Sequence, residues 1–176
     1  MQGAPDATAL IGYGAIFTRF FITLGPLKIL GPFAQLTRET DEATMRKIAV
    51  RAFVLAVIAV VAGGFAGRML LENWGISSSA MLLAGGIIFV LVGLNLVLEQ
   101  YQPAHPVPPP IPGEPMAAAM RITFPTVVTP YGIAALIVVL NNSRAAERTG
   151  AILAILLAVM VLNLLTMLYA RRIMGG

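Results

Sequence analysis

The apolar residues of this chain fall into five long runs that short polar segments separate. The runs cover roughly residues 9–36, 49–71, 76–98, 120–141 and 150–170. An α-helix rises about 1.5 Å per residue, so about 20 apolar residues cross a hydrocarbon layer about 30 Å thick. Each run reaches that length, and none shows the alternating ten-residue segments that are typical of a membrane β-barrel. The pattern predicts an all-α, polytopic transmembrane bundle with five spans.

Composition supports the same fold class. Of the 176 residues, 58% are hydrophobic and 11% are charged, and the mean hydropathy is +0.85. A soluble domain carries about 25% charged residues, so lipid must cover much of this surface. The net charge of +4 does not indicate a nucleic-acid partner, because the cations lie at the membrane ends of the runs. The chain has no cysteine, which excludes disulfides and thiolate metal sites.

The distribution of cations predicts the orientation in a bacterial inner (plasma) membrane. Seven cations fall on the side of the 38–51 loop, and three fall on the other side. The seven are Arg38, Arg46, Lys47, Arg51, Arg121, Arg171 and Arg172, and the three are Arg68, Arg144 and Arg148. The positive-inside rule therefore predicts a cytoplasmic 38–51 loop and a periplasmic N-terminus. The N-terminal segment lacks Lys and Arg before Arg19 and carries Asp6, so we expect the first span itself to direct insertion.

A proline-rich segment divides the chain. Residues 101–115 read YQPAHPVPPPIPGEP and hold seven of the twelve prolines. Such a sequence favours extended polyproline conformations and predicts a semi-rigid linker outside the membrane. Residues 1–100 then form a first repeat of three spans, and residues 116–176 form a second, incomplete repeat of two. The single histidine, His105, lies in this linker, where we expect it to be solvated.

The first and fourth runs both carry helix-breaking residues. The first contains two Gly-Pro pairs in GPLKILGP, residues 25–32, and the fourth contains Pro125, Pro130 and Gly132. Broken spans at corresponding positions of two halves indicate a transporter site built from an inverted repeat. The alternative is a pair of ordinary kinks, because proline and glycine are common in membrane helices. The candidate binding or gating residues are Gly25, Pro26, Lys28, Gly31, Pro32, Pro125, Thr129, Pro130 and Gly132.

Lys28 and three further polar residues lie inside the expected spans. Arg19 and Lys28 are nine residues apart, which places them on nearly opposite helix faces. A cation at mid-bilayer costs about 2.5–3.5 kcal/mol, so each either faces a central cavity that attracts an anionic group or reaches an interface by snorkelling. Asn95 and Asn163 either line the same cavity or form interhelical hydrogen bonds.

The sequence offers no constellation of catalytic residues. The acidic residues lie at span ends or in loops, so we expect neither a Ser-His-Asp set, nor paired embedded carboxylates, nor a metal site. We therefore expect no enzymatic activity and no cofactor. Proton coupling through a buried acid is not expected either, whereas carbonyls at broken helices could coordinate Na⁺.

Three sequence features together resemble the MarC family of integral membrane proteins (UPF0056). They are the stretch WGISSSAMLLAGGIIFVLVGLNLVL at 74–98, the GPLKILGP segment and the PTVVTPY segment at 125–131. The resemblance implies a three-plus-three inverted repeat, and some relatives are described as neutral amino-acid transporters. A sixth span would follow residues 170–176, so either the sequence is truncated or this member is shortened. The chain departs from the family pattern at Gly25, where the pattern has asparagine. It departs again at Lys28, Thr129 and Tyr131, where the pattern has glycine.

Two functions of different classes are consistent with these features. The first is a transporter of a small polar or amphipathic, amino-acid-like solute that works by alternating access between the two broken spans. The second is a membrane scaffold or accessory subunit whose glycine-rich faces, GGFAG at 63–67 and AGG at 84–86, bind other helices. The expected partners are the lipid bilayer, the solute, and either a second copy or the subunits of a membrane complex. A polar cavity at the breaks favours the first function, and a packed centre with outward glycine faces favours the second.

Overall fold

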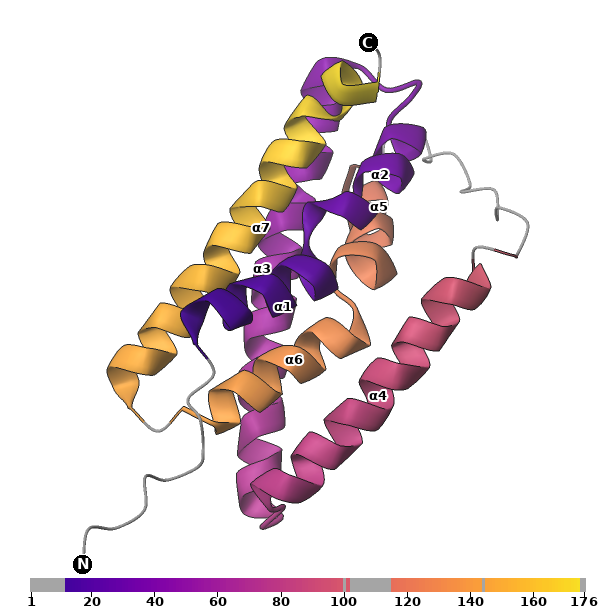
Figure 1. Cartoon of the computed structure of the whole chain (residues 1–176). Coiled ribbons are helices and arrows are strands. Elements are labelled where there is room, and N and C mark those ends of the chain that lie inside the picture. The colour runs from indigo at the N-terminus through magenta and orange to yellow at the C-terminus, as the bar shows by residue number, and fades with distance from the viewer. Residues whose placement is uncertain (1–11, 100, 102–114, 144, 175–176) are drawn as a thin grey trace, which may run out of the picture.

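The computed structural model describes residues 12–99, 101, 115–143 and 145–174, and this part of the chain is helical without a β-strand (Figure 1). The predicted all-α fold is therefore confirmed. Most of the linker, including His105, lies outside the described residues, as does Asp6. In chain order the elements are α1 (Tyr13–Leu24), η1 (Pro26–Lys28), α2 (Leu30–Leu36), α3 (Glu42–Asn73), α4 (Ser78–Glu99), α5 (Pro115–Arg121), η2 (Ile122–Val127), α6 (Pro130–Asn141) and α7 (Ala146–Met174).

Several of these elements are long and apolar enough to cross a membrane. Within the described residues, three helical stretches qualify: Tyr13–Leu36, Glu42–Asn73 and Ala146–Ile173. A fourth span is formed by Pro115–Val127 and Pro130–Asn141 if this pair, bent by 62°, counts as one. The helix α4 has 22 residues, about 33 Å at the usual rise, and it coincides with the third apolar run. Its membrane crossing, and so the count of five spans, stays a prediction.

The helices pack reciprocally across the two halves of the chain. The broken pair α1–α2 of the first half packs on the long helix α7 of the second half. The broken pair α5–α6 of the second half packs on the long helix α3 of the first half, and α3 and α7 contact each other. Helix α4 packs on α6 and lies at the edge of the bundle (Figure 1). Each broken span therefore contacts elements of the opposite half.

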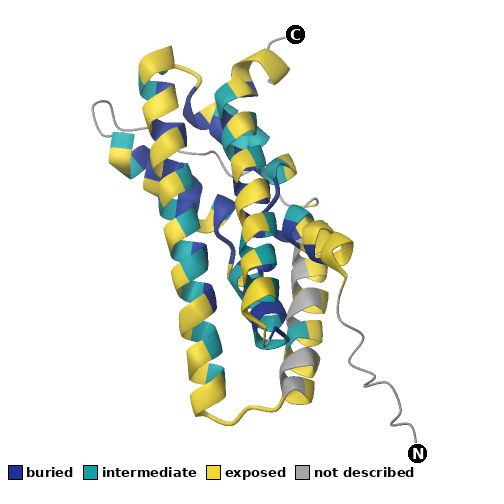
Figure 2. Ribbon diagram, turned by 90° about the vertical axis from the view of Figure 1, so that its left-hand side faces the viewer, coloured by how far each residue is buried: buried dark blue, intermediate teal, exposed yellow. Residues whose placement is uncertain are grey.

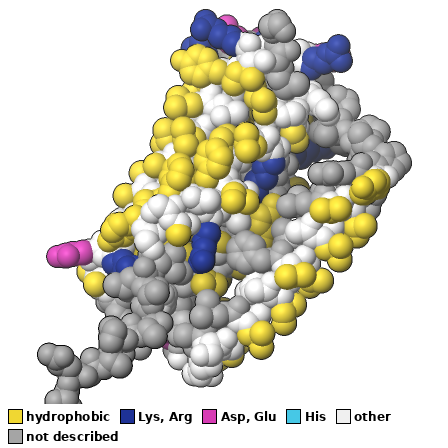
Figure 3. All heavy atoms as spheres, in the orientation of Figure 1, with side chains coloured by type: hydrophobic (Ala, Val, Ile, Leu, Met, Phe, Trp, Pro, Cys, Tyr) yellow, Lys and Arg dark blue, Asp and Glu magenta, His cyan; other side chains and the backbone are white. Residues whose placement is uncertain are grey.

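Buried residues lie on the helix faces that are turned toward one another (Figure 2). Many of the exposed residues are large and hydrophobic. The fully buried side chains include Phe20 and Leu24 of α1, Phe33 of α2 and Leu136 of α6. Hydrophobic side chains also cover much of the flank seen in Figure 3, while Lys and Arg gather at the end of the bundle where α7 finishes. This surface is that of a helical membrane protein, because a lipid-facing flank needs no polar cover.

The glycines of GGFAG allow α3 and α6 to approach closely. A Cβ atom on Gly64 would lie 2.8 Å from Cγ of Leu136, and one on Gly67 would lie 2.7 Å from Cγ1 of Ile137. Side chains at these positions would push the two helices apart. The GGFAG motif is therefore used inside this chain, between its two halves.

The loop between α2 and α3 is fixed at both of its ends. Asp41 caps α3 by accepting a 2.9 Å hydrogen bond from the Thr44 N–H, so this helix begins before the apolar run does. The Arg171 guanidinium near the end of α7 donates to the carbonyl of Thr37 at 2.7 Å and to that of Thr40. The end of α7 and this loop thus lie at the same end of the bundle.

Candidate functional site

The first broken span is interrupted at Gly25 and Pro26. Gly25 has an extended backbone (φ −78°, ψ 173°), and Pro26 has no N–H to donate to the preceding turn. A Cβ atom on Gly25 would overlap the Phe21 carbonyl oxygen, so glycine is needed at this position. The last carbonyls of any α-helix lack intrahelical donors, so the end of α1 must find partners for them elsewhere.

The second broken span is interrupted between Phe124 and Thr129. Phe124 has an extended backbone (φ −117°, ψ 126°), and Pro125 follows it directly. Thr129 then caps α6, because its Oγ1 accepts a 3.2 Å hydrogen bond from the Gly132 N–H, and Pro130 occupies the first helical position. This combination ends one helix and starts another in a new direction, which produces the 62° bend.

The two breaks lie against each other inside the bundle. The Thr129 hydroxyl donates to the Thr23 carbonyl at 3.3 Å, which joins the start of α6 to the end of α1. A Cβ atom on Gly132 would overlap Cδ2 of Leu24, so the glycine lets the two helix ends touch. Thr23 and Thr129 are 3% and 6% exposed, which places this contact in the interior. The two breaks therefore meet at a buried contact.

The Lys28 side chain turns back into the break. Its Nζ donates to the Thr23 carbonyl and, at 3.1 Å, to the Tyr131 hydroxyl. The same ammonium lies 4.8 Å from the centroid of the Tyr131 ring, within the range of a cation–π interaction. It therefore sits at the carboxyl end of α1, where the helix dipole favours a positive charge. Lys28 is half-buried, and whether it lines a cavity for a solute stays a prediction.

Asn163 of α7 completes the contact from a third direction. Its Nδ2 donates to the Leu24 carbonyl at 2.5 Å, and the residue is 2% exposed. Side chains thus satisfy two consecutive carbonyls of α1, those of Thr23 and Leu24. Two of these side chains, Thr129 and Asn163, belong to the second half of the chain. The Oδ1 atom of Asn163 has no hydrogen-bond partner among the described residues.

The remaining candidates lie farther from this contact or outside the described side chains. Arg19 is exposed on α1, and Pro125 and Pro130 are also exposed. A Cβ atom on Gly31 would meet nothing within 4 Å, and Pro32 is half-buried in the first turn of α2. Pro26 is half-buried in the first break itself. Asn95 lies on α4, and its side chain is not among those that the structure describes.

Three residues of the site were not among the sequence candidates. Thr23 and Leu24 contribute their carbonyls, and Tyr131 contributes its hydroxyl and its ring. A signal existed for Tyr131, since it occupies a position where the resembled family pattern has glycine, as do Lys28 and Thr129. These three departures meet at one contact. Nothing in the residue type of Thr23 indicates its role, because the atom involved is a backbone oxygen.

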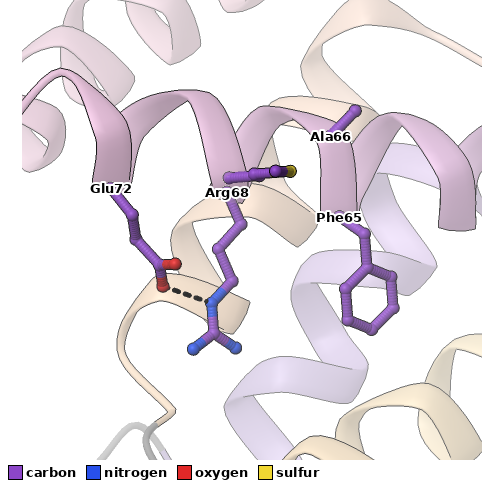
Figure 4. A pocket seen from close by; sticks show the side chains of 5 residues that line it. Phe65, Ala66, Arg68 and Glu72 are labelled. Atoms are coloured by element: carbon purple, nitrogen blue, oxygen red, sulfur yellow. Dashed lines mark hydrogen bonds and ion pairs between the residues drawn. The ribbon is translucent and has the colours of Figure 1, made fainter.

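A separate groove lies at the far end of α3. It has a volume of about 330 Å³ and is lined by Phe65, Ala66, Arg68, Met69 and Glu72. Figure 4 shows Arg68, Glu72 and Phe65 on one side of the helix, and Arg68 Nε forms a 2.8 Å ion pair with Glu72 Oε1. Because this cation is already neutralised and the groove has no residue from either break, it is not part of the candidate site. The described residues hold no cluster of three or more His, Asp or Glu that could bind a metal ion.

The comparisons with known proteins agree on one family. The family model described as "MarC family integral membrane protein" matches residues 10–175. A "UPF0056 membrane protein" of Archaeoglobus fulgidus is 30% identical over 84 residues, which cover 48% of this chain and 39% of that protein. Another "UPF0056 membrane protein", from Aquifex aeolicus, is 32% identical over 91 residues, which cover 48% of this chain and 42% of that protein. The matched stretches thus span less than half the length of these relatives. No solved structure gives a significant match.

Proposed function

Because the chain belongs to the MarC family of integral membrane proteins and is built as a multi-pass helical bundle, we propose that it transports a small solute across the membrane. The solute is polar or amphipathic and amino-acid-like, and transport proceeds by alternating access. The observation that carries the proposal is the contact between the two broken spans, where α1 ends against the start of α6. This contact is packed rather than hollow, with Thr23 and Thr129 3% and 6% exposed, so the proposal takes it as the closed state of a site that opens. Backbone groups at such breaks cannot be satisfied by lipid, so they are available to a solute when the contact opens.

The reciprocal packing supports the mechanism. Each broken pair rests on the long helix of the opposite half, as expected for two repeats related by an axis in the membrane plane. A rocking motion of one half against the other would separate the breaks without unfolding either long helix. We place the site on the residues that meet there, namely Gly25, Lys28, Thr129, Gly132 and Asn163.

We propose the inner membrane of a bacterium as the location, with the 38–51 loop in the cytoplasm. The argument is the excess of Lys and Arg on that side of the chain. The hydrogen bonds from Arg171 to the carbonyls of Thr37 and Thr40 support a common side for this loop and the end of α7.

A second function, a scaffold for other membrane helices, is favoured by one observation on α4. Gly86 and Gly93 of this helix are exposed, and a Cβ atom on either would meet nothing within 4 Å. Small outward residues allow close helix packing, and a second copy of the chain or another membrane protein would supply the partner. By contrast, the GGFAG motif of α3 is already used against α6.

Solute flux in proteoliposomes tests the transport proposal. Purified protein is reconstituted, and uptake of a panel of radiolabelled small zwitterions is compared among the wild type, Pro26→Ala, Pro130→Ala and empty liposomes. We expect the wild type to give flux above that of the empty liposomes. Both proline variants should lose about tenfold, because an increase of about 1.4 kcal/mol in the activation free energy slows a step tenfold. The control is Gly31→Ala, which lies in the same motif and has open space around it. Equal flux in all samples, empty liposomes included, would exclude transport of these solutes.

A further inference from the structure

The amide of Asn163 is only half used in the structure. Its Nδ2 donates to the Leu24 carbonyl at 2.5 Å, while its Oδ1 has no partner among the described residues. The opposite amide orientation would place Oδ1 against the Leu24 carbonyl oxygen, and two acceptors repel each other. The hydrogen bond to Leu24 therefore determines which atom of the amide is left over.

An unpaired acceptor at this depth requires an explanation. Asn163 is 2% exposed, and the amide makes one further, weak contact, 3.9 Å from Nδ2 to Sδ of Met160. A buried polar atom without a partner costs about 1–3 kcal/mol, so native proteins rarely leave one without a functional or solvent partner. A leucine of similar volume would avoid that cost. The oxygen therefore calls for a partner from outside the protein, either a water molecule or a ligand.

The surroundings indicate what kind of group the oxygen accepts. Oδ1 can only accept, so its partner carries an N–H or O–H hydrogen. The amide rests on the carboxyl end of α1, where the helix dipole favours a positive charge over a neutral or negative one. A protonated amine meets both conditions.

The neighbouring carbonyl of α1, that of Thr23, binds the side chain of Lys28, which supplies a hydrogen-bond donor. The Lys28 ammonium has three hydrogens, and two of them are directed at the Thr23 carbonyl and the Tyr131 hydroxyl. The third can be donated to an acceptor of the solute, such as a carboxylate oxygen. The two side chains that bind the consecutive carbonyls of Thr23 and Leu24 thus offer an unused donor, on Lys28, and an unused acceptor, on Asn163.

We propose that Asn163 Oδ1 is a solute-binding atom that accepts a hydrogen bond from the amine end of the transported molecule. This assignment rests on the proposed transport function and deepens it. Asn163 selects solutes that have at least one N–H hydrogen, and Lys28 binds their opposite, acceptor end.

A matched pair of probes tests the proposal on the wild-type protein alone. N,N-dimethylglycine and its trimethylated counterpart have the same carboxylate and the same positive nitrogen, but only the first has an N–H. A ligand that binds the folded protein raises its unfolding temperature according to its concentration and affinity. We expect N,N-dimethylglycine and methylammonium to raise the unfolding temperature of the purified protein in a saturable manner. The trimethylated compound should bind at least tenfold more weakly than the dimethylated one.

A variant assigns the discrimination to the proposed atom. In Asn163→Leu, we expect the preference for the N–H-bearing probe to disappear, while the control Thr166→Val on the same helix keeps the wild-type preference. If Asn163→Leu does not fold, the comparison of the two probes on the wild-type protein still tests the proposal. Retention of the full preference in Asn163→Leu would overturn the proposal. Equal binding of the two probes, or binding of neither N–H-bearing probe, would mean that the oxygen holds only a water molecule.

The outcome is separate from that of the flux experiment. Probe binding is measured by unfolding and needs no transport. If the protein discriminates between the probes but gives no flux, the binding site is supported and the transport function is refuted. Flux without discrimination would retain transport and refute the role of Asn163.

Discussion

The first broken span interrupts its helix over a few residues around Gly25 and continues as one span, whereas the second bends by 62° between Val127 and Pro130. They also differ in how their backbone groups are satisfied. The second break supplies partners from its own segment: the Val128 N–H donates to the Thr123 carbonyl at 2.8 Å, and Thr129 caps Gly132. The first break depends on side chains for the carbonyls of Thr23 and Leu24.

Most of those side chains come from the other half of the chain. Thr129 and Asn163 lie more than 100 residues away from the carbonyls that they satisfy, and only Lys28 belongs to the first half. If the two halves move apart, the second break keeps its local hydrogen bonds. In the first break, the Leu24 carbonyl loses Asn163, and the Thr23 carbonyl loses Thr129 and keeps Lys28. In the proposed transport function, the first break is therefore where backbone acceptors would become available to a solute, and the second break is stabilised more by its own segment.

The largest expected effect comes from the glycine at the first break. Gly25→Ala places a methyl group on the Phe21 carbonyl oxygen, so the end of α1 must shift away from α6 and α7. Overpacking of this kind costs typically 1–3 kcal/mol, and because the obstacle is backbone we expect about 3 kcal/mol. Thermal or denaturant unfolding in detergent micelles measures the loss.

The second Gly-Pro pair of the same motif provides the control. A Cβ atom on Gly31 meets nothing within 4 Å, and this residue lies in α2. Gly31→Ala should be neutral or should stabilise by up to about 1 kcal/mol, since alanine is the better helix former. Equal losses in the two variants would show that the first break is not sterically defined at Gly25.

The next effect concerns the hydroxyl that joins the breaks. Thr129→Val keeps the shape of the side chain but removes both the cap on Gly132 and the hydrogen bond to Thr23. We expect a loss of about 1–2 kcal/mol, because a cap and a buried hydrogen bond are lost together. Thr18→Val, which removes an exposed intrahelical hydrogen bond to the Gly14 carbonyl, should change stability by less than about 0.5 kcal/mol. A Thr129→Val loss no larger than that of Thr18→Val would contradict the dependence of the first break on the second half.

The sequence predicts the helices of this molecule better than it predicts the contacts at the breaks. Five apolar runs, two Gly-Pro pairs and the Pro125–Gly132 segment locate the elements, because bilayer thickness and proline chemistry act locally. Hydrogen bonds to Thr23 and Leu24 use backbone oxygens, which every residue has, so no residue type indicates them. For Asn163 the sequence predicts either a cavity lining or an interhelical hydrogen bond, but it does not identify the partner of that bond. Its partner is 139 positions away, and only the folded chain reveals it.

The pairing of Lys28 with Tyr131 gives a smaller effect that spans both breaks. The ammonium contacts the hydroxyl at 3.1 Å and lies 4.8 Å from the ring centroid. In a double-mutant cycle with Lys28→Met and Tyr131→Leu, we expect a coupling free energy of about 1 kcal/mol, in the range of a half-buried cation–π contact with a hydrogen bond. Lys47→Met, an exposed cation in α3, should show no coupling to Tyr131→Leu. Additive effects of Lys28→Met and Tyr131→Leu would mean that this contact does not hold the breaks together.

The smallest effect is expected at the exposed cap of α3, formed by Asp41, which we compare with the buried cap of α6, formed by Thr129. Hydrogen bonds from the Thr44 side chain and then from its backbone N–H hold the pKa of the Asp41 carboxyl below its ordinary value of 3.8. A lowered pKa in the folded protein means that the stabilisation is present above the unfolded value and is lost as the pH falls through the folded value. The difference in unfolding free energy between the wild type and Asp41→Ala should therefore shrink as the pH is lowered from neutrality to below the folded pKa of Asp41. The corresponding difference for Thr129→Val should not change over this range, because a threonine hydroxyl does not titrate there. If the loss of unfolding free energy in Asp41→Ala stays constant over this range, the charge of Asp41 does not contribute to its cap. If the loss in Thr129→Val depends on pH, an ionisable group acts at the contact between the breaks.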